Sequence, residues 1–364
     1  MKYFSKEIQK DGYIYKTAGV KARDDVDAIL RDAGFKELLI PTVGDEDRKE
    51  AGKVKKLMAH FRIRNVWNKE TKHMGKGDIL VIQYPTIEHS IFLTSVLRDL
   101  RKRGVKIYFL IHDLEYIRLA VPGNEEMTSA KSKRLELEQK ALHFGNKIIV
   151  HNEAMIDKMV ELGFNRKKLV SLEIFDYLIP DYDSQKMTER KNNKDMPVII
   201  AGNLLKAKAE YVYSLPETVE FNLFGVNYED EEKKNIHYMG SFLPDELPYS
   251  LDGSFGLVWD GNTSETCSGV YGEYLKINNP HKTSLYLASG IPVIIWSKAA
   301  LAGFICNNNA GFAVDSLYDI PKFIENLTPE KYSEMKKGAE FLSKKLKSGY
   351  FTKQAIEKCL KKAD

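Results

Sequence analysis

The chain contains few cysteines and no long apolar stretch, and both shortages narrow its class. Cys267, Cys306 and Cys359 are the three cysteines among 364 residues, and they lie too far apart for a disulfide framework or a zinc site. No stretch reaches the roughly 18 apolar residues of a membrane span, and the first residues lack the apolar core of a secretory signal. We therefore expect a cytoplasmic protein, at most peripheral to the inner face of a membrane.

The chain also has no large excess of charge and lacks several familiar catalytic signatures. Its net charge of +4, from 55 basic and 51 acidic residues, is too small to indicate nucleic-acid binding. The sequence has no phosphate-binding lysine loop, GxSxG elbow or GxGxxG fingerprint, which disfavours kinases, serine hydrolases and nicotinamide oxidoreductases. The histidines show no metal-ligand spacing, and the DYD triplet at 181–183 falls in a polar segment, so no bound metal is expected.

Apolar runs that alternate with amphipathic stretches make up most of the remaining sequence. From about residue 35 to 177 the runs are FKELLIP, DILVIQYP, VKIYFLIHD, NKIIVHN and KLVSLEIF, whereas the opening KYFSKEI is a poor candidate for a strand. A second series runs from PVIIAGN to AGFAV, and two basic amphipathic helices are expected after it. Such alternation predicts doubly wound α/β domains. The expected boundaries are a first domain at 1–180, a linker at 181–195, a second domain at 196–345 and a last helix at 346–364.

The segment Lys276–Trp296 carries the strongest functional signal. Its sequence, KINNPHKTSLYLASGIPVIIW, is typical of a polar loop, a helix and a buried parallel strand. Lys282 and the free amides near Thr283 would lie at the positive end of this helix, where the macrodipole favours an anion. A phosphate group is therefore the expected ligand. Three polar side chains beside Lys282 are expected to contribute to this site rather than to serve as solvated loop residues: Asn278, Asn279 and His281.

Loops that follow other strands of the second series add candidates, each with a purely structural alternative. Lys206 follows the turn at Gly202 and would reach a diphosphate, or it is a solvated lysine at a strand–helix junction. Tyr228 ends a loop suited to stacking on a nucleobase, or it belongs to a tight turn. Asp260 would accept hydrogen bonds from sugar hydroxyls, or it caps a loop.

These segments resemble the donor-binding region of GT-B glycosyltransferases. In that family the ligand-binding helix ends in a small-x-Gly-x-Pro-Val turn, which is similar to residues 288–293 (ASGIPV). The closer likeness is to a bacterial subgroup that contains β-1,6-galactofuranosyltransferases of surface polysaccharide synthesis and the glucosyltransferase that extends glycans on streptococcal serine-rich adhesins. That subgroup has a box similar to NNPHK at 278–282. Further matches, GVKAR at 19–23 and HDLE at 112–115, occur in the family's order.

The resemblance implies a GT-B fold, in which two Rossmann-like doubly wound domains face an interdomain cleft. The first domain would bind the acceptor, the second would bind the nucleotide-sugar donor, and the last helix would return to the first domain. The implied reaction moves a hexosyl group, such as galactofuranose or glucose, from a UDP-sugar to a glycan or lipid-linked glycan in surface polysaccharide or glycoprotein biosynthesis. Retaining members carry a pair of glutamates where this chain has Ile277 and Leu285, so inversion without a metal or other cofactor is expected.

Inversion requires a general base for the acceptor hydroxyl, and the end of the run VKIYFLIHD offers candidates. Asp113 is preferred over His112 because it lies further into the loop, and Glu115 is a third candidate. Strand-end capping is the structural alternative for this pair. Tyr84 ends another strand at the same edge and would stack on a sugar. The first glycine-containing loop, which includes Thr17, Gly19, Lys21 and Arg23, would border the donor phosphates and the acceptor. The alternative is that Lys21 and Arg23 are ordinary surface charges.

Two further classes of function stay open. A UDP-sugar epimerase of GT-B fold would be recognised by incubation with UDP-GlcNAc and a search for UDP-ManNAc or released UDP. A non-catalytic glycan-binding partner of another transferase would keep affinity for UDP without turnover. The absence of the glutamate pair is compatible with this alternative. The expected partners are a UDP-sugar and a glycan or lipid-linked acceptor, with no nucleic acid. A peripheral membrane contact and a homo-oligomer are both compatible with the sequence.

Overall fold

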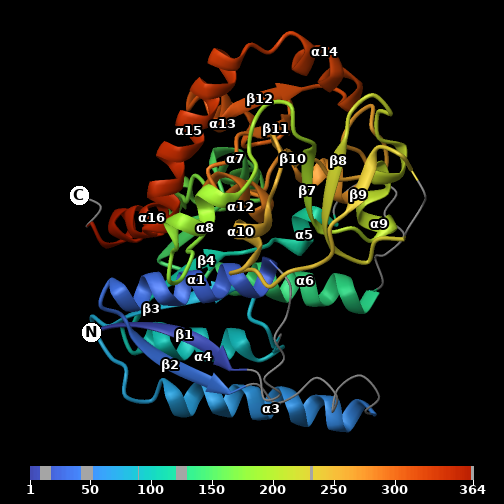
Figure 1. The fold of residues 1–364 in the computed structure, drawn as a ribbon. Coiled ribbons are helices and arrows are strands. Elements are labelled where there is room, and N and C mark those ends of the chain that lie inside the picture. Colours follow the sequence, from blue (N-terminus) through green and yellow to red (C-terminus); the bar gives the residue numbers. More distant parts are fainter. Residues whose placement is uncertain (9–17, 42–51, 89, 120–128, 230–232, 362–364) are drawn as a thin grey trace.

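A computed structural model of the chain describes residues 1–8, 18–41, 52–88, 90–119, 129–229 and 233–361. These residues form two β-sheets of six strands each, surrounded by helices (Figure 1). Every recorded pairing between neighbouring strands is parallel, so both sheets are of the kind built from β–α–β crossovers. The expectation of two doubly wound α/β domains is confirmed.

The first sheet has the strand order β2-β1-β3-β4-β5-β6. The adjacent residues of β3 point to opposite faces, with Val81 packing in one apolar cluster and Leu80 and Ile82 in the other. Burial on both faces explains the continuous apolar sequence of this strand. The strands of this half are β1 Lys2–Ile8, β2 Lys36–Pro41, β3 Ile79–Tyr84, β4 Lys106–Ile111, β5 Lys147–Val150 and β6 Leu169–Ser171; its helices are α1 Ala18–Asp32, α3 Lys53–Glu70, α4 Leu93–Lys102, α5 Glu115–Arg118, α6 Ser129–Leu142, α7 Glu153–Glu161 and the 3-10 turn η1 Arg166–Lys168.

The opening segment forms a strand although its sequence is a poor apolar run. β1 lies inside the sheet, between β2 and β3, and therefore has hydrogen-bonding neighbours on both sides. Tyr3 and Phe4 are buried, and Phe4 packs with Val26 and Leu30 of α1. The position of the segment in the sheet thus outweighs the low apolar content of its second half.

The second sheet has the strand order β12-β11-β10-β7-β8-β9. All four side chains of β11 are buried, and each such apolar side chain contributes roughly 1.5–3 kcal/mol to folding. The strands of this half are β7 Val198–Asn203, β8 Phe221–Val226, β9 Ile236–Tyr238, β10 Gly256–Val258, β11 Val293–Trp296 and β12 Gly311–Val314; its helices are α9 Lys206–Ala209, α10 Leu247–Ser250, α11 Gly269–Tyr274, α12 His281–Ala288, α13 Ala302–Asn307, α14 Ile320–Glu325, α15 Pro329–Lys347 and α16 Tyr350–Leu360, with the 3-10 turns η2 Glu210–Ser214 and η3 Leu317–Asp319.

The segment between the two sheets and the end of the chain both contain helices. The predicted linker at 181–195 includes the short helix α8, Ser184–Glu189. The last helix, α16, returns to the first sheet, where it contacts α1, β5 and β6 (Figure 1). Asp176 fixes its start by accepting hydrogen bonds from the amides of Phe351 and Thr352, at 3.1 and 2.7 Å. Among the described residues, no helix combines the length and the apolar character needed to cross a membrane.

Candidate active site

A chain of hydrogen-bonded polar side chains runs along the carboxyl ends of β3 and β4 and ends at His112. The Gln83 amide nitrogen donates to the Asp27 carboxylate at 2.6 Å and to the Arg23 carbonyl at 3.2 Å. These two acceptors fix the orientation of the amide, so its oxygen faces His112 Nε2 at 2.5 Å. His112 Nε2 must therefore carry the proton in this contact. The other ring nitrogen, Nδ1, is left as the acceptor.

The His112 imidazole is held in its neutral form. Burial lowers its pKa well below the usual 6.5, and the charge of Arg23 and the nearby rings of His151 and His281 lower it further. Its Nδ1 atom has no hydrogen-bond partner among the residues that the structure describes. A neutral imidazole with one unpaired nitrogen can accept a proton near neutral pH.

The two acidic candidates next to His112 are both engaged by arginines. Arg118 donates to Asp113 Oδ2 at 2.9 Å and lies 3.7 Å from Glu115. Arg134 also forms an ion pair with Glu115. A hydroxyl that approached Asp113 Oδ2 or the Glu115 carboxylate would therefore compete with a guanidinium group, whereas Asp113 Oδ1 has no hydrogen-bond partner among the described residues.

The aromatic ring of Phe175 brings residues from both halves together. His112, from the first sheet, stacks on this ring with a centroid distance of 5.5 Å and an interplanar angle of 9°. His281, the first residue of α12, meets the ring edge at 6.0 Å. The candidate base His112 and the first residue of the predicted phosphate-binding helix, His281, thus contact the same aromatic ring, although they are 169 positions apart in the sequence.

A direct hydrogen bond also joins the loop after β4 to α11. The Leu114 amide donates to the Tyr274 hydroxyl at 3.0 Å. Burial raises the pKa of Tyr274 well above 10, and the nearby Asp113 carboxylate raises it further, so this hydroxyl stays protonated. The loop 112–114 therefore contacts the segment that precedes the predicted donor helix.

At the start of α12 the predicted phosphate ligand Lys282 is bound to a protein carboxylate. Its ammonium group donates to Asp260 Oδ1 at 2.8 Å and to the Trp259 carbonyl at 2.9 Å, and both charged side chains are largely buried. An ammonium group has three protons, so one remains for another acceptor. The residue before the helix is Pro280, which provides no side-chain cap for the first-turn amides.

The remaining residues of the NNPHK box differ in their surroundings. Asn279 is buried and bonds to residues of the first half: its amide nitrogen Nδ2 donates to the His151 carbonyl at 2.6 Å, and its Oδ1 accepts from Asn152 at 2.7 Å. It therefore joins the two halves. Asn278 Oδ1 and Thr283 Oγ1 are buried polar atoms with no partner among the described residues.

Part of the predicted first loop, including Thr17, lies outside the described residues. Lys21 is buried and bridges the halves, with its ammonium 2.6 Å from Asp25 and 2.7 Å from Asp245. Burial raises the pKa of Asp25 to about 7 in spite of this cation. Gly19 is exposed, and a methyl group added there would meet no atom within 4 Å. Arg23 donates to the Pro85 carbonyl.

Lys206 and Tyr228 meet at a third position, beyond β7 and β8. The Lys206 ammonium lies 4.8 Å from the centre of the Tyr213 ring, which stacks on Tyr228 at 5.9 Å. The strand ends approach closely here because Gly225, with φ of +156°, has no side chain: a Cβ atom there would lie 1.8 Å from the Gly202 carbonyl oxygen. Since β8, β7 and β10 are neighbours in the sheet, this group and Asp260 follow the same carboxyl edge.

Four residues of the site were not singled out from the sequence. Gln83 is the single polar residue in the apolar run ILVIQY, and such an interruption at a strand end is a usable signal. Asp27, Phe175 and Tyr274 gave no comparable signal, because their roles depend on partners that are distant in the sequence.

A cavity of about 520 Å³ opens in the first half beside the carboxyl end of β3. Tyr84, at the end of that strand, lines it together with His60 of α3 and Glu138 of α6. The Tyr84 hydroxyl donates to the Glu138 carbonyl at 2.8 Å and is thereby fixed. No group of three or more His, Cys, Asp or Glu side chains suited to a metal occurs within the described part of the chain.

Comparison with known proteins identifies relatives of both halves. Residues 7–174 match the family described as the N-terminal domain of glucosyltransferase 3-like proteins, and residues 198–359 match its C-terminal domain. The chain is 35% identical over 288 residues to the β-1,6-galactofuranosyltransferase WbbI of Escherichia coli K12, covering 78% of this chain and 79% of that protein. It is 27% identical over 344 residues to glucosyltransferase 3 of Streptococcus gordonii, covering 92% of each chain.

Solved structures share the architecture at low sequence identity. Sucrose-phosphate synthase from Thermosynechococcus elongatus aligns with a TM-score of 0.60 and 12% identity, covering 98% of both chains. The lipopolysaccharide outer core galactosyltransferase WaaB aligns with a TM-score of 0.58 and 10% identity, covering 99% of both chains. Together with the two parallel sheets, these likenesses confirm the predicted GT-B fold.

Proposed function

Because the chain belongs to the glucosyltransferase 3-like family of glycosyltransferases, we propose that it transfers a galactofuranosyl, glucosyl or similar group from a UDP-sugar. The acceptor is a glycan or a lipid-linked glycan of bacterial surface polysaccharide or glycoprotein biosynthesis. Transfer inverts the anomeric centre and needs no metal. The names of the two relatives support the choice of sugar.

The contact of the loop 112–114 with the segment that leads into α12 is the observation that carries this proposal. His112 and His281 share the Phe175 ring, and Leu114 donates to Tyr274. A group able to accept a proton and a helix start able to bind phosphate therefore lie together at the junction of the halves. Inverting transfer from a nucleotide-sugar needs both, one on each side of the sugar that moves.

The donor diphosphate would bind at the start of α12. Lys282 keeps one ammonium proton for a phosphate oxygen, and the uncapped amides of the first turn can donate to another. As the bond from the anomeric carbon to the phosphate oxygen breaks, charge develops on that oxygen, where the lysine and the helix dipole stabilise it. This support for the leaving group is our reason for proposing a metal-independent reaction.

His112 is the base that the geometry favours, with Asp113 as the alternative predicted from the sequence. Nδ1 of His112 would take the proton of the acceptor hydroxyl as its oxygen attacks the anomeric carbon, and UDP would leave with the electron pair of the broken bond. The imidazolium then returns its proton to solvent. Gln83 supports this role because it fixes the tautomer, whereas Arg118 holds one of the two carboxylate oxygens of Asp113.

A donor screen tests the proposed function. Purified protein is incubated with UDP-galactofuranose, UDP-glucose or UDP-GlcNAc, with and without a panel of octyl glycosides, and UDP release is measured with EDTA present and absent. We expect acceptor-dependent release from one of the first two donors that EDTA leaves unchanged. Loss of turnover that Mn²⁺ or Mg²⁺ restores would contradict metal independence.

The same screen separates the other functions that the sequence left open. UDP-ManNAc formed from UDP-GlcNAc without an acceptor would identify an epimerase. Binding of UDP with no turnover of any donor would identify a non-catalytic partner. Either result would refute the proposed transfer.

A further inference from the structure

The helix α3 has apolar side chains on two opposite faces. Ala59, Ile63 and Trp67 repeat every four residues and are buried against the sheet. The other face is exposed: Val54, Leu57, Met58 and Phe61 have exposed fractions of 76%, 44%, 52% and 36%. Their spacing of three and four residues gathers them in one stripe, which we call the apolar stripe. A surface helix of an ordinary soluble domain carries polar residues there.

Basic residues surround this stripe. α3 contains six lysines and arginines and one acidic residue, Glu70, which is its last. Lys53, Lys55 and Arg62 are exposed beside the stripe. An exposed apolar face bordered by cations is typical of helices that lie in the interface of an anionic bilayer. Figure 1 shows α3 at the edge of the molecule farthest from the second sheet.

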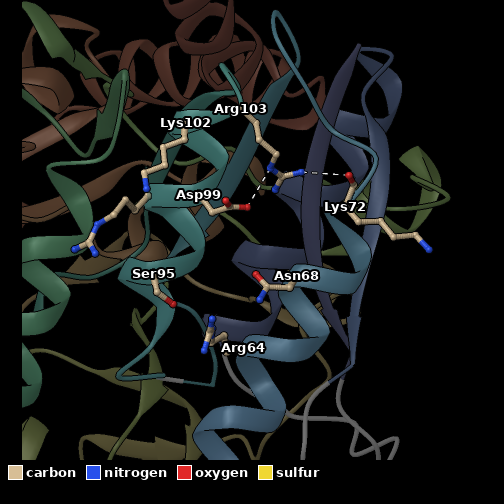
Figure 2. A pocket seen from close by; sticks show the side chains of 8 residues that line it. Arg64, Asn68, Lys72, Ser95, Asp99, Lys102 and Arg103 are labelled. Carbon is tan, nitrogen blue, oxygen red and sulfur yellow. Dashed lines mark hydrogen bonds and ion pairs between the residues drawn. The ribbon is translucent and has the colours of Figure 1, made fainter.

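A groove between α3 and α4 extends the positive surface. It has a volume of about 550 Å³, and five of its lining residues are cations, against the single acid Asp99 (Figure 2). Asp99 pairs with Arg103 at 3.1 Å. The other cations, Arg64, Lys72, Arg98 and Lys102, have no ion-pair partner among the described residues. The groove therefore offers unpaired cations to phosphate groups.

We propose that the apolar stripe and this groove form one docking surface for an anionic phospholipid bilayer, with the stripe inserted between headgroups and lipid phosphates in the groove. A soluble phosphate compound would account for the groove and leave the stripe unexplained. A second copy of the chain packed face to face would bring its cations against those of the first, which is unfavourable. The bilayer alone matches both the apolar and the charged parts.

The docking surface also borders the cavity beside β3. The Phe61 ring stacks on the Phe92 ring with a centroid distance of 4.4 Å. Ile91, the residue before Phe92, is exposed and lines that cavity. His60 of α3 lines it as well. A bilayer seated on α3 would therefore adjoin the cavity mouth. If the proposed transfer is correct, on which this consequence rests, the lipid-linked glycan is the acceptor favoured.

Vesicle co-sedimentation of the full chain tests the proposal. Wild-type protein should bind to vesicles of equal parts phosphatidylglycerol and phosphatidylcholine. It should bind much more weakly to vesicles of phosphatidylcholine alone. The stripe variant is Val54→Ser/Leu57→Ser/Met58→Ser, and the groove variant is Arg98→Gln/Lys102→Gln. Each should bind the anionic vesicles about tenfold more weakly than the wild type, or more weakly still. All five positions lie on the outer surface or line the groove, so a melting temperature close to that of the wild type should accompany the loss.

Matched variants in the second half serve as controls. Tyr318→Ser/Phe341→Ser removes two exposed aromatic rings, and Lys331→Gln/Lys337→Gln removes two exposed cations. Binding within twofold of wild type is expected for both. Equal losses in these controls, or no binding of wild type to anionic vesicles, would overturn the proposal. So would a dimer, measured by light scattering, that the stripe variant converts to monomer. Because binding is measured without donor or acceptor, its outcome is independent of the proposed transfer.

Discussion

The carboxyl edges of the two sheets differ in how their polar side chains are paired. In the first half the chain from Asp27 through Gln83 ends at an imidazole nitrogen that has no partner among the described residues. In the second half the cation Lys282 is bound to Asp260 and to a carbonyl oxygen. One edge thus offers an unpaired proton acceptor, and the other offers a cation that is already oriented.

This difference fits the two requirements of the proposed inverting transfer. A base must be neutral and accessible before the substrate arrives, and burial keeps His112 neutral by lowering its pKa. A buried ammonium group without a counter-charge would be costly, and Asp260 offsets that cost while one N–H stays available. The comparison predicts that changes at the first edge affect turnover and changes at the second affect UDP binding.

The largest expected effect is on turnover in His112→Ala. Removal of a general base typically lowers the rate by about 10²–10⁴-fold, and we expect a loss of this size in kcat/KM with UDP affinity nearly unchanged. Asp113→Asn is the matched comparison, since it keeps the shape of the loop and weakens the ion pair with Arg118. A larger loss in Asp113→Asn than in His112→Ala would reverse the assignment of the base. No loss in either variant would remove the base from this edge altogether.

The next effect is on UDP binding in Lys282→Met. A partly buried charge-assisted contact is worth about 1.5–3 kcal/mol, so UDP affinity should fall by roughly 10–150-fold. Calorimetric titration with UDP, or the UDP-induced rise in melting temperature, measures it. Lys276→Met is the control, because Lys276 lies in the same segment but pairs with the half-exposed Glu273. Equal losses in the two variants would mean that net charge, rather than a contact at α12, determines UDP affinity.

The fold was predictable from the sequence wherever local pattern determines it. β4 and β11 are continuous apolar runs, and both are buried strands of parallel sheets. β1 shows the limit: four of its seven residues are polar, and it is a strand because β2 and β3 flank it. The composition of one segment does not predict which strands will pair with it, because those strands come from other parts of the chain.

The candidate site was predictable at the level of segments and less so at the level of contacts. The NNPHK box does lie at a helix start, as its sequence indicates. Yet Asn279 bonds to His151 and Asn152, residues more than 120 positions away, and Gln83 reaches Asp27 across 56 positions. Such pairings follow from tertiary packing, and no spacing rule within one segment contains them.

A smaller effect concerns the contact of α16 with the first half. Asp176→Ala would leave the amides of Phe351 and Thr352 buried without their acceptor, which should lower the free energy of unfolding by about 2–4 kcal/mol. Thermal unfolding should show a melting temperature several degrees lower. Asp32→Ala removes the exposed ion pair of Lys353 with α1 and should change it little. Loss of transfer in Asp176→Ala at temperatures where the protein stays folded would mean that this contact also serves the site.

The smallest effect is a shift in the pH profile, and it tests why the two edges differ. Because burial and the charge of Arg23 lower the pKa of His112, the base stays deprotonated as the pH falls through 6.5, and the acid limb of kcat/KM should lie below that value. Arg23→Gln removes the cation, so the pKa of His112 should rise and the acid limb should move toward 6.5. Lys6→Gln is the control, because Lys6 pairs with Asp27 at 3.9 Å and is absent from the charges that lower the His112 pKa. An acid limb that stays in place in Arg23→Gln would separate the limb from His112 and return Asp113 to first place as the base.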